Sequence, residues 1–115
     1  MHMGEQLFES WESSPYGRTL YRCDRAVMVD TGRAFPHLGV ARMTGVPLWV
    51  RNFGFRPDVP AQPGRLLAWL RCFDNTWLGL VEVLASCANG HSTMPMQLWL
   101  PACAITPVDA DDAAR

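Results

Sequence analysis

The stretch GRLLAWLRCFDNTWLGLVEVLASCANGHSTMPMQLWLPACAITP, residues 64–107, decides the fold. Its first apolar run ends at Asp74-Asn75-Thr76, which is typical of turns because Asp and Asn side chains hydrogen-bond the nearby backbone. A second run, residues 77–85, is followed by Asn89-Gly90, a dipeptide suited to the positive φ of a hairpin turn. Residues 94–100 make a third run. The two turn sequences between these three apolar runs predict three consecutive antiparallel strands.

Alternation within these runs predicts which side chains face the core. One face of the third run carries Met94, Met96, Leu98 and Leu100, and the other carries Gln97 and Trp99. In the second run, alternation directs Val81 and Val83 inward and Glu82 toward solvent. Residues 78–84 also fit a helix by periodicity alone, but the flanking turns favour the strand.

Length and composition predict one soluble domain. A chain of 115 residues with 49% hydrophobic residues can bury a core of its own. We expect residues 1–107 to form the domain and residues 108–115 to be a flexible acidic tail. No apolar run approaches the roughly 20 residues that span a bilayer, and the first residues do not resemble a signal peptide. A cytoplasmic protein without a membrane partner is therefore expected.

The charged residues and the cysteines say less about function than the hydrophobic pattern says about fold. The net charge of −1 creates no overall field that favours nucleic acid or membrane. All ten basic residues are arginine, a composition that GC-rich bacterial genomes favour. The four cysteines form no CxxC pair and are expected to be reduced, mostly buried thiols.

The upstream chain is expected to complete the sheet. Residues 5–12 fit a short helix of about two turns, and residues 18–30 fit a strand. The remaining predictions run in chain order: a turn at Thr31-Gly32, an irregular edge strand over 33–43, a strand over 46–55 and a surface loop over 56–64. Five or six strands with short connections predict an all-β, mainly antiparallel barrel or sandwich.

Residues 65–107 resemble an SH3-like small β-barrel. Trp77 opens a central strand, and Pro101 ends the last long strand. Ala102-Cys103-Ala104 then fits one helical turn before a closing short strand at Ile105. The resemblance implies a small barrel. The acidic loop and paired tyrosines with which SH3 domains bind proline-rich peptides are missing, so it does not imply that activity.

The segment Trp49-Val50-Arg51-Asn52-Phe53-Gly54-Phe55-Arg56 resembles part of the RNA-recognition-motif signature. In that family two aromatic residues on a central strand stack bases and an arginine meets phosphate. A strand would place Trp49, Arg51, Phe53 and Phe55 on one face. The alternative is that these aromatic side chains belong to the core.

No residues with the spacing of a catalytic or metal site stand out. Cys87 and His91, with Cys72 and Cys103, have the residue types of a zinc site, but in the predicted hairpin Cys72 and Cys87 lie at opposite ends of a strand. A nucleophilic pair of Cys23 or Cys103 with His37 lacks a local signature. We expect no metal, no cofactor and no enzymatic activity.

The remaining signal is a surplus of large apolar side chains, namely Trp69, Trp77, Trp99, Met94 and Met96. Such a surplus often marks a partner interface, and symmetric self-association is common. We therefore predict a binding module that works as a homodimer or with another protein. Its predicted binding residues are Trp49, Arg51, Phe53, Phe55, Arg56, Trp77 and Trp99. The alternatives are single-stranded nucleic-acid binding through residues 49–55, and a small-molecule pocket or enzyme of unknown chemistry.

Overall fold

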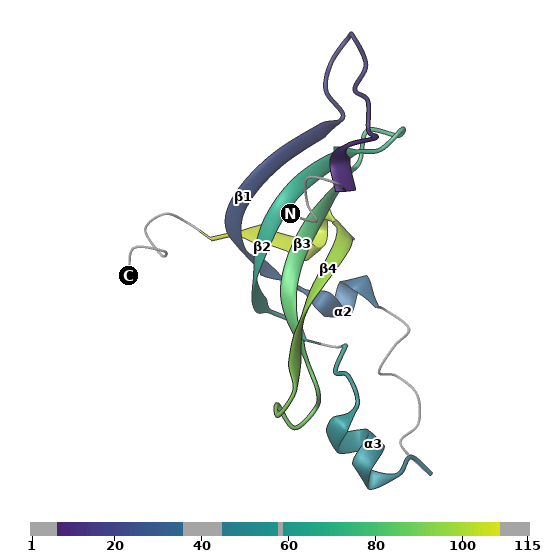
Figure 1. The fold of residues 1–115 in the computed structure, drawn as a ribbon, viewed down its shortest axis with the longest axis vertical. Helices are drawn as coiled ribbons and strands as arrows, with labels where there is room; N and C mark the ends of the chain where they lie inside the picture. The colour runs from purple at the N-terminus through teal and green to yellow at the C-terminus, as the bar shows by residue number, and fades with distance from the viewer. Residues whose placement is uncertain (1–6, 36–44, 58, 109–115) are drawn as a thin grey trace.

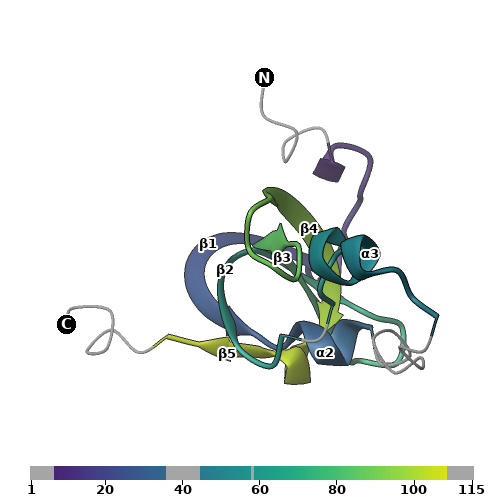
Figure 2. The same cartoon turned by 90° about the horizontal axis from the view of Figure 1, so that it is seen from below.

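The computed structural model of the chain describes residues 7–35, 45–57 and 59–108. Their main feature is a five-stranded antiparallel sheet with the order β4-β3-β2-β1-β5, curled like half of a barrel (Figures 1 and 2). The strands are β1 (Leu20–Val29), β2 (Gln62–Arg71), β3 (Trp77–Ser86), β4 (Thr93–Pro101) and β5 (Ile105–Pro107). The prediction of a mainly antiparallel β protein is confirmed.

The three strands expected in residues 65–107 are confirmed as β2, β3 and β4. Their turns lie where the sequence places them, since Asn75 has a φ of 68° and Gly90 a φ of 78°. Positive φ favours these two residue types. A single 3-10 turn, η1 (Ala102–Ala104), follows β4 and leads into β5, which pairs with β1.

The β2–β3 turn is stabilised by its own side chains. Asp74 Oδ1 accepts hydrogen bonds from the Thr76 hydroxyl at 2.6 Å and from the Thr76 backbone N–H at 3.1 Å. Both bonds favour the carboxylate over the carboxylic acid, so Thr76 lowers the pKa of Asp74 below its ordinary value. The turn is therefore more stable when Asp74 is ionised.

Asp74→Ala is expected to lower the melting temperature most at neutral pH. The lowered pKa means that the carboxylate's contribution is complete above the ordinary Asp pKa of about 3.9 and is lost as pH falls through the lower, folded-state value. The wild-type and variant melting curves should therefore converge in acid. Thermal melts from pH 7 to pH 2, with the exposed carboxylate variant Glu12→Ala as control, test this. A difference that does not change with pH would contradict it.

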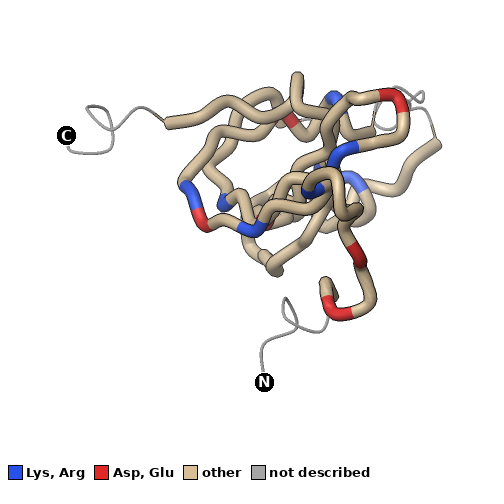
Figure 3. The backbone as a smooth tube through the Cα atoms, turned by 90° about the horizontal axis from the view of Figure 1, so that it is seen from above, with Lys and Arg blue, Asp and Glu red and all other residues tan. Residues whose placement is uncertain are grey.

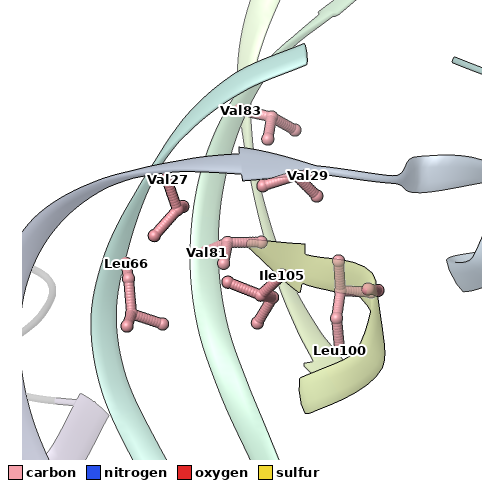
Figure 4. Close-up of a cluster of buried hydrophobic side chains, with 8 residues drawn as sticks. Val27, Val29, Leu66, Val81, Val83, Leu100 and Ile105 are labelled. Atoms are coloured by element: carbon pink, nitrogen blue, oxygen red, sulfur yellow. The ribbon is translucent and has the colours of Figure 1, made fainter. Parts of the chain in front are cut away.

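The core lies on the concave face of the sheet. Its buried side chains come from β1, β2, β3, β4, η1 and β5, and point toward one another (Figure 4): Val27, Val29, Leu66, Val81, Val83, Leu100, Ala104 and Ile105. The alternation predicted in the second run is confirmed, because Val81 and Val83 are buried while Glu82 accepts a hydrogen bond from Gln97 at 3.3 Å. The expected division of the third run is also present, with Leu100 buried and Gln97 exposed.

The opposite face of the sheet is also partly covered. Ala68 and Leu80 are cross-strand partners on this face and are buried, with Trp99 next to Leu80 on β4. The N-terminal segment lies on this side of the sheet, away from β5 (Figures 1 and 2). The Arg22 guanidinium stacks 5.0 Å from the centroid of the Phe8 ring. The sheet therefore has apolar side chains buried on both faces.

Upstream, β1 confirms the predicted strand, but other predictions differ. Of the expected N-terminal helix, residues 5 and 6 lie outside the described residues, and only Leu7 and Phe8 are helical. The turn at Thr31-Gly32 is instead a one-turn helix, α2 (Thr31–Ala34), in which Arg33 pairs with Asp30 at 3.3 Å. The edge strand predicted over 33–43 is wrong for residues 33–35, and residues 36–43 lie outside the described chain.

The strand predicted over 46–55 is also wrong, because the chain forms the helix α3 (Leu48–Phe53). Pro47 precedes it with a φ of −57°, a conformation suited to a helix start, and the Gly54 N–H closes it on the Val50 carbonyl. Trp49 and Phe53, four residues apart, share a helix face as readily as a strand face. The predicted loop 56–64 is shorter than expected, because β2 begins at Gln62.

None of the described helices is long and apolar enough to cross a membrane.

Candidate functional site

An aromatic pocket lies at one end of the sheet. It has a volume of about 520 Å³ and is lined by Tyr21, Trp69, Trp77 and Ala102. Small-molecule sites in proteins usually measure about 300–1,000 Å³, so this pocket is large enough to hold a ligand. We call it the aromatic pocket.

Strand register builds the pocket from three strands. Tyr21 on β1 is the cross-strand partner of Trp69 on β2, and Trp69 is the partner of Gly79 on β3. Gly79 has no side chain, so the indole of Trp69 lies over it; a Cβ there would meet Trp69 Cζ3 at 3.2 Å. Tyr21 and Trp77 then face each other with ring centroids 5.7 Å apart, tilted by 48°. The walls of the aromatic pocket are therefore formed by aromatic side chains.

One cation lies beside the aromatic pocket. Arg71 is the cross-strand partner of Trp77, and its guanidinium carbon is 5.1 Å from the centroid of the Trp77 ring. It is exposed and forms no ion pair with a carboxylate of the described residues. The nearest acidic side chain along the chain, Asp74, is hydrogen-bonded within its own turn. The pocket thus combines apolar walls with a positive rim.

A second candidate surface surrounds α3, at the other end of the molecule (Figure 1). No residue of α3 is buried. The α3 surface, as we call it, comprises five exposed side chains: Leu48, Trp49, Val50, Phe53 and Phe55. Trp49 is 67% exposed and Phe53 61%. Solvent-exposed aromatic side chains on one short helix are typical of a binding surface.

A hollow adjoins the α3 surface. It measures about 190 Å³, which is room for one large side chain. Phe53 and Phe55 form one side of it, and β3, the β3–β4 turn and the start of β4 form the other: Ala85, Ser86, Cys87, Ser92, Thr93 and Met94. A backbone bridge between Phe55 and Cys87 attaches the chain that follows α3 to the sheet.

The predicted binding residues do not form one site. Trp49, Arg51, Phe53, Phe55 and Arg56 lie in or just after α3, whereas Trp77 lies in the aromatic pocket and Trp99 on the convex face of the sheet. A helix turns about 100° per residue, so Arg51 points roughly 160° away from Trp49. The row of aromatic side chains that base stacking needs is therefore not formed by residues 49–55. Figure 3 shows the arginines spread over several parts of the chain, with carboxylates among them.

The cysteines lie apart from one another, and all four are free thiols. Cys72 follows β2 and Cys87 follows β3, at opposite ends of that hairpin, as expected. Cys87 Sγ donates to Asn89 Oδ1 at 2.8 Å and accepts the Ser92 N–H at 3.3 Å, and the Ser92 bond is the main cause of its lowered pKa. Burial raises the pKa of Cys23. His37 lies outside the described residues.

Sequence reasoning missed Tyr21 and Ala102 as pocket residues and treated Trp69 only as surplus apolar surface. The pairing of β1 with β2 brings Tyr21 to Trp69, and the sequence does not specify that pairing. The comparisons add no assignment: no protein-family model matches the chain, and neither the curated proteins nor the solved structures include a match.

Proposed function

We propose that this chain is a small SH3-like interaction module that associates with a second copy of itself through the α3 surface. The observation that carries the proposal is that α3 has no buried residue and that its large apolar side chains Leu48, Trp49 and Phe53 are more than 60% exposed, although the chain has a well-formed core elsewhere. Burial of about 100 Å² of apolar surface contributes about 2.5 kcal/mol, so such a face gains from a partner.

The SH3-like part of the proposal is supported by the order of elements in residues 65–107. Trp77 begins β3, Pro101 ends β4, and η1 leads into the short strand that starts at Ile105. These are the features on which the resemblance rests. They support a small barrel as the scaffold, while the binding surface belongs to α3 and is not part of the resemblance.

A second copy fits the α3 surface because the surface offers both a projection and a hollow. Trp49 is 67% exposed, and Phe53, which shares a face of α3 with Trp49, forms part of the wall of the hollow. A two-fold axis lets each copy insert its Trp49 into the hollow of the other, which is the self-complementarity that a symmetric dimer requires. The net charge of −1 adds little repulsion between copies.

The edge of the sheet favours side-chain docking over strand addition. β4 is an edge strand and contains Pro95 and Pro101, which cannot donate backbone hydrogen bonds to an added strand. Because α3 has only six residues, the interface is small. Interfaces below about 1,200 Å² of total buried area are typical of weak complexes, so we expect weak self-association that depends on protein concentration.

Trp49→Ala and Phe53→Ala are each expected to weaken dimerisation at least tenfold, since aromatic side chains at the centre of an interface carry most of its binding energy. Sedimentation velocity from 1 to 500 µM measures the dissociation constant of each variant. Phe73→Ala is the matched control, because Phe73 is fully exposed in the β2–β3 turn, far from α3. A wild-type protein that stays monomeric at 500 µM would overturn the proposal. So would a Phe73→Ala variant that loses as much affinity as Phe53→Ala.

Single-stranded nucleic-acid binding remains a prediction for which the geometry offers no stacking row. Titration of a fluorescent oligonucleotide at low and moderate salt checks it, since such binding weakens steeply with salt.

A further inference from the structure

We propose that the aromatic pocket binds a small planar apolar ligand that carries one carboxylate. This inference does not depend on self-association. Trp69 and Trp77, which line the aromatic pocket, lie at the end of β2 and the start of β3, whereas α3 lies beyond the opposite end of the sheet (Figure 1). It follows from three properties of the pocket: its size, its aromatic walls and the charge at its rim.

The size and walls indicate a flat ring system. Among the described residues the lining consists of three aromatic side chains and one alanine, and a volume of about 520 Å³ is large enough for a bicyclic aromatic molecule. Tyr21 and Trp77 are tilted by 48° with ring centroids 5.7 Å apart, so their faces are not stacked on each other. Aromatic side chains attract a further ring edge-to-face or in an offset stack, at centroid distances of about 4.5–7 Å.

The positive charge at the rim of the aromatic pocket favours a ligand that carries a carboxylate over a ligand that carries a cation. An aromatic pocket without charged neighbours would prefer a cation, because ring faces carry negative potential. Here the Arg71 guanidinium already occupies that position over Trp77, and it repels a second cation. Its N–H groups retain the capacity to bind a carboxylate, since Arg71 is exposed and forms no ion pair with a described carboxylate.

Other charges near the aromatic pocket do not reverse this preference. Arg22, next to Tyr21, points to the other face of the sheet, where it stacks on Phe8. Asp74 is the one carboxylate in the adjoining turn, and its Oδ1 is hydrogen-bonded to Thr76. Arg65, further along β2, is paired with Asp24. Arg71 is therefore the group that a ligand acid would reach from the aromatic walls.

The test uses three isosteric probes: 2-naphthoate, its neutral amide 2-naphthamide, and the cation (2-naphthylmethyl)trimethylammonium. Isothermal titration calorimetry at 20 mM salt should show 2-naphthoate binding at least tenfold more tightly than the amide, with the cation weakest. The advantage of the acid should shrink at 500 mM salt, because an exposed ion pair is screened. Chemical-shift changes confined to Tyr21, Trp69, Arg71 and Trp77 would locate the probe.

Substitutions in the protein separate the contribution of charge to the ligand affinity from the contribution of aromatic packing. Arg71→Gln should remove the tenfold preference for the acid while leaving the affinity for the amide within twofold, and Arg71→Lys should retain part of the preference. Trp77→Ala should weaken acid and amide alike. Arg25→Gln is the matched control, because Arg25 is an exposed arginine of β1 that does not line the aromatic pocket. A thermal melting curve of each variant serves as the control that the variant is folded.

Several outcomes would overturn the proposal. They are tighter binding of the cation than of the acid, absence of binding by all three probes at 1 mM, and an equal effect of Arg25→Gln and Arg71→Gln. A Phe53→Ala variant that is monomeric and still binds 2-naphthoate would show that the two proposals stand or fall separately.

Discussion

Leu80→Ala should lower the free energy of unfolding by about 2–5 kcal/mol, the usual cost of removing a fully buried leucine side chain. Leu80 is 2% exposed, although it lies on the convex face of the sheet, opposite the main core. The cost combines the lost burial of the side chain with the cavity that it leaves beside its cross-strand partners Ala68 and Trp99. A loss of this size is a large fraction of the stability of a domain of about 100 residues.

The measurement is urea denaturation followed by circular dichroism, with Leu84→Ala as the control. Leu84 is on the same strand but is 60% exposed, so its replacement should cost less than about 0.5 kcal/mol. Equal effects of the two substitutions would show that the convex face is not covered in solution. A small effect of both would indicate that Leu80 is not shielded from solvent, and that β3 is buried on its concave side alone.

Local turn chemistry explains why the second half of the fold could be predicted. The positions of Asp74-Asn75 and Asn89-Gly90 are sufficient to place the end of β2, both ends of β3 and the start of β4, because turn residues act on their immediate neighbours. Hydrophobic alternation then assigns Val81 and Val83 to the core. These inferences need no knowledge of which distant segments pair.

The α3 segment could not be predicted in the same way. Trp49, Phe53 and Phe55 are spaced by four and by two, which fits one helix face for the first two and one strand face for all three. Whether residues 48–53 form a strand depends on the presence of a neighbouring strand edge. The edges of this sheet are β4 and β5, and α3 pairs with neither. The tertiary structure therefore decides between two locally acceptable conformations.

The aromatic pocket depends on long-range register. Tyr21 and Trp69 are far apart in sequence, and they meet because β1 and β2 pair in one register; a shift of one residue would turn every side chain of β1 to the other face. A bulge between Leu66 and Ala68 changes the alternation within β2, so Leu66 before it and Trp69 after it face the same side of the sheet although they are three residues apart. The sequence predicts the aromatic surplus but not where the side chains gather.

Gly79→Val should destabilise the protein by about 1–3 kcal/mol or more, the range typical of overpacked cores. A Cβ at this position would meet Ile105 Cδ1 most closely, Leu66 Cδ1 at 3.0 Å and Trp69 Cζ3 at 3.2 Å. Leu66 and Ile105 are buried, so neither side chain can move without displacing other core atoms. The half-buried indole of Trp69 is the group with room to shift, and it would shift into the aromatic pocket.

Gly79→Val therefore couples the core to the aromatic pocket. Urea denaturation should show the loss of stability, and tryptophan fluorescence of the folded variant should change because the indole of Trp69 moves. Affinity for 2-naphthoate should fall at least tenfold, although Gly79 itself does not line the pocket. Gly17→Val is the control, since a Cβ at Gly17 meets no atom within 4 Å. If Gly79→Val lost stability but bound 2-naphthoate as tightly as wild type, the core would relax through Ile105 and Leu66 instead, and Trp69 would not depend on the glycine beneath it.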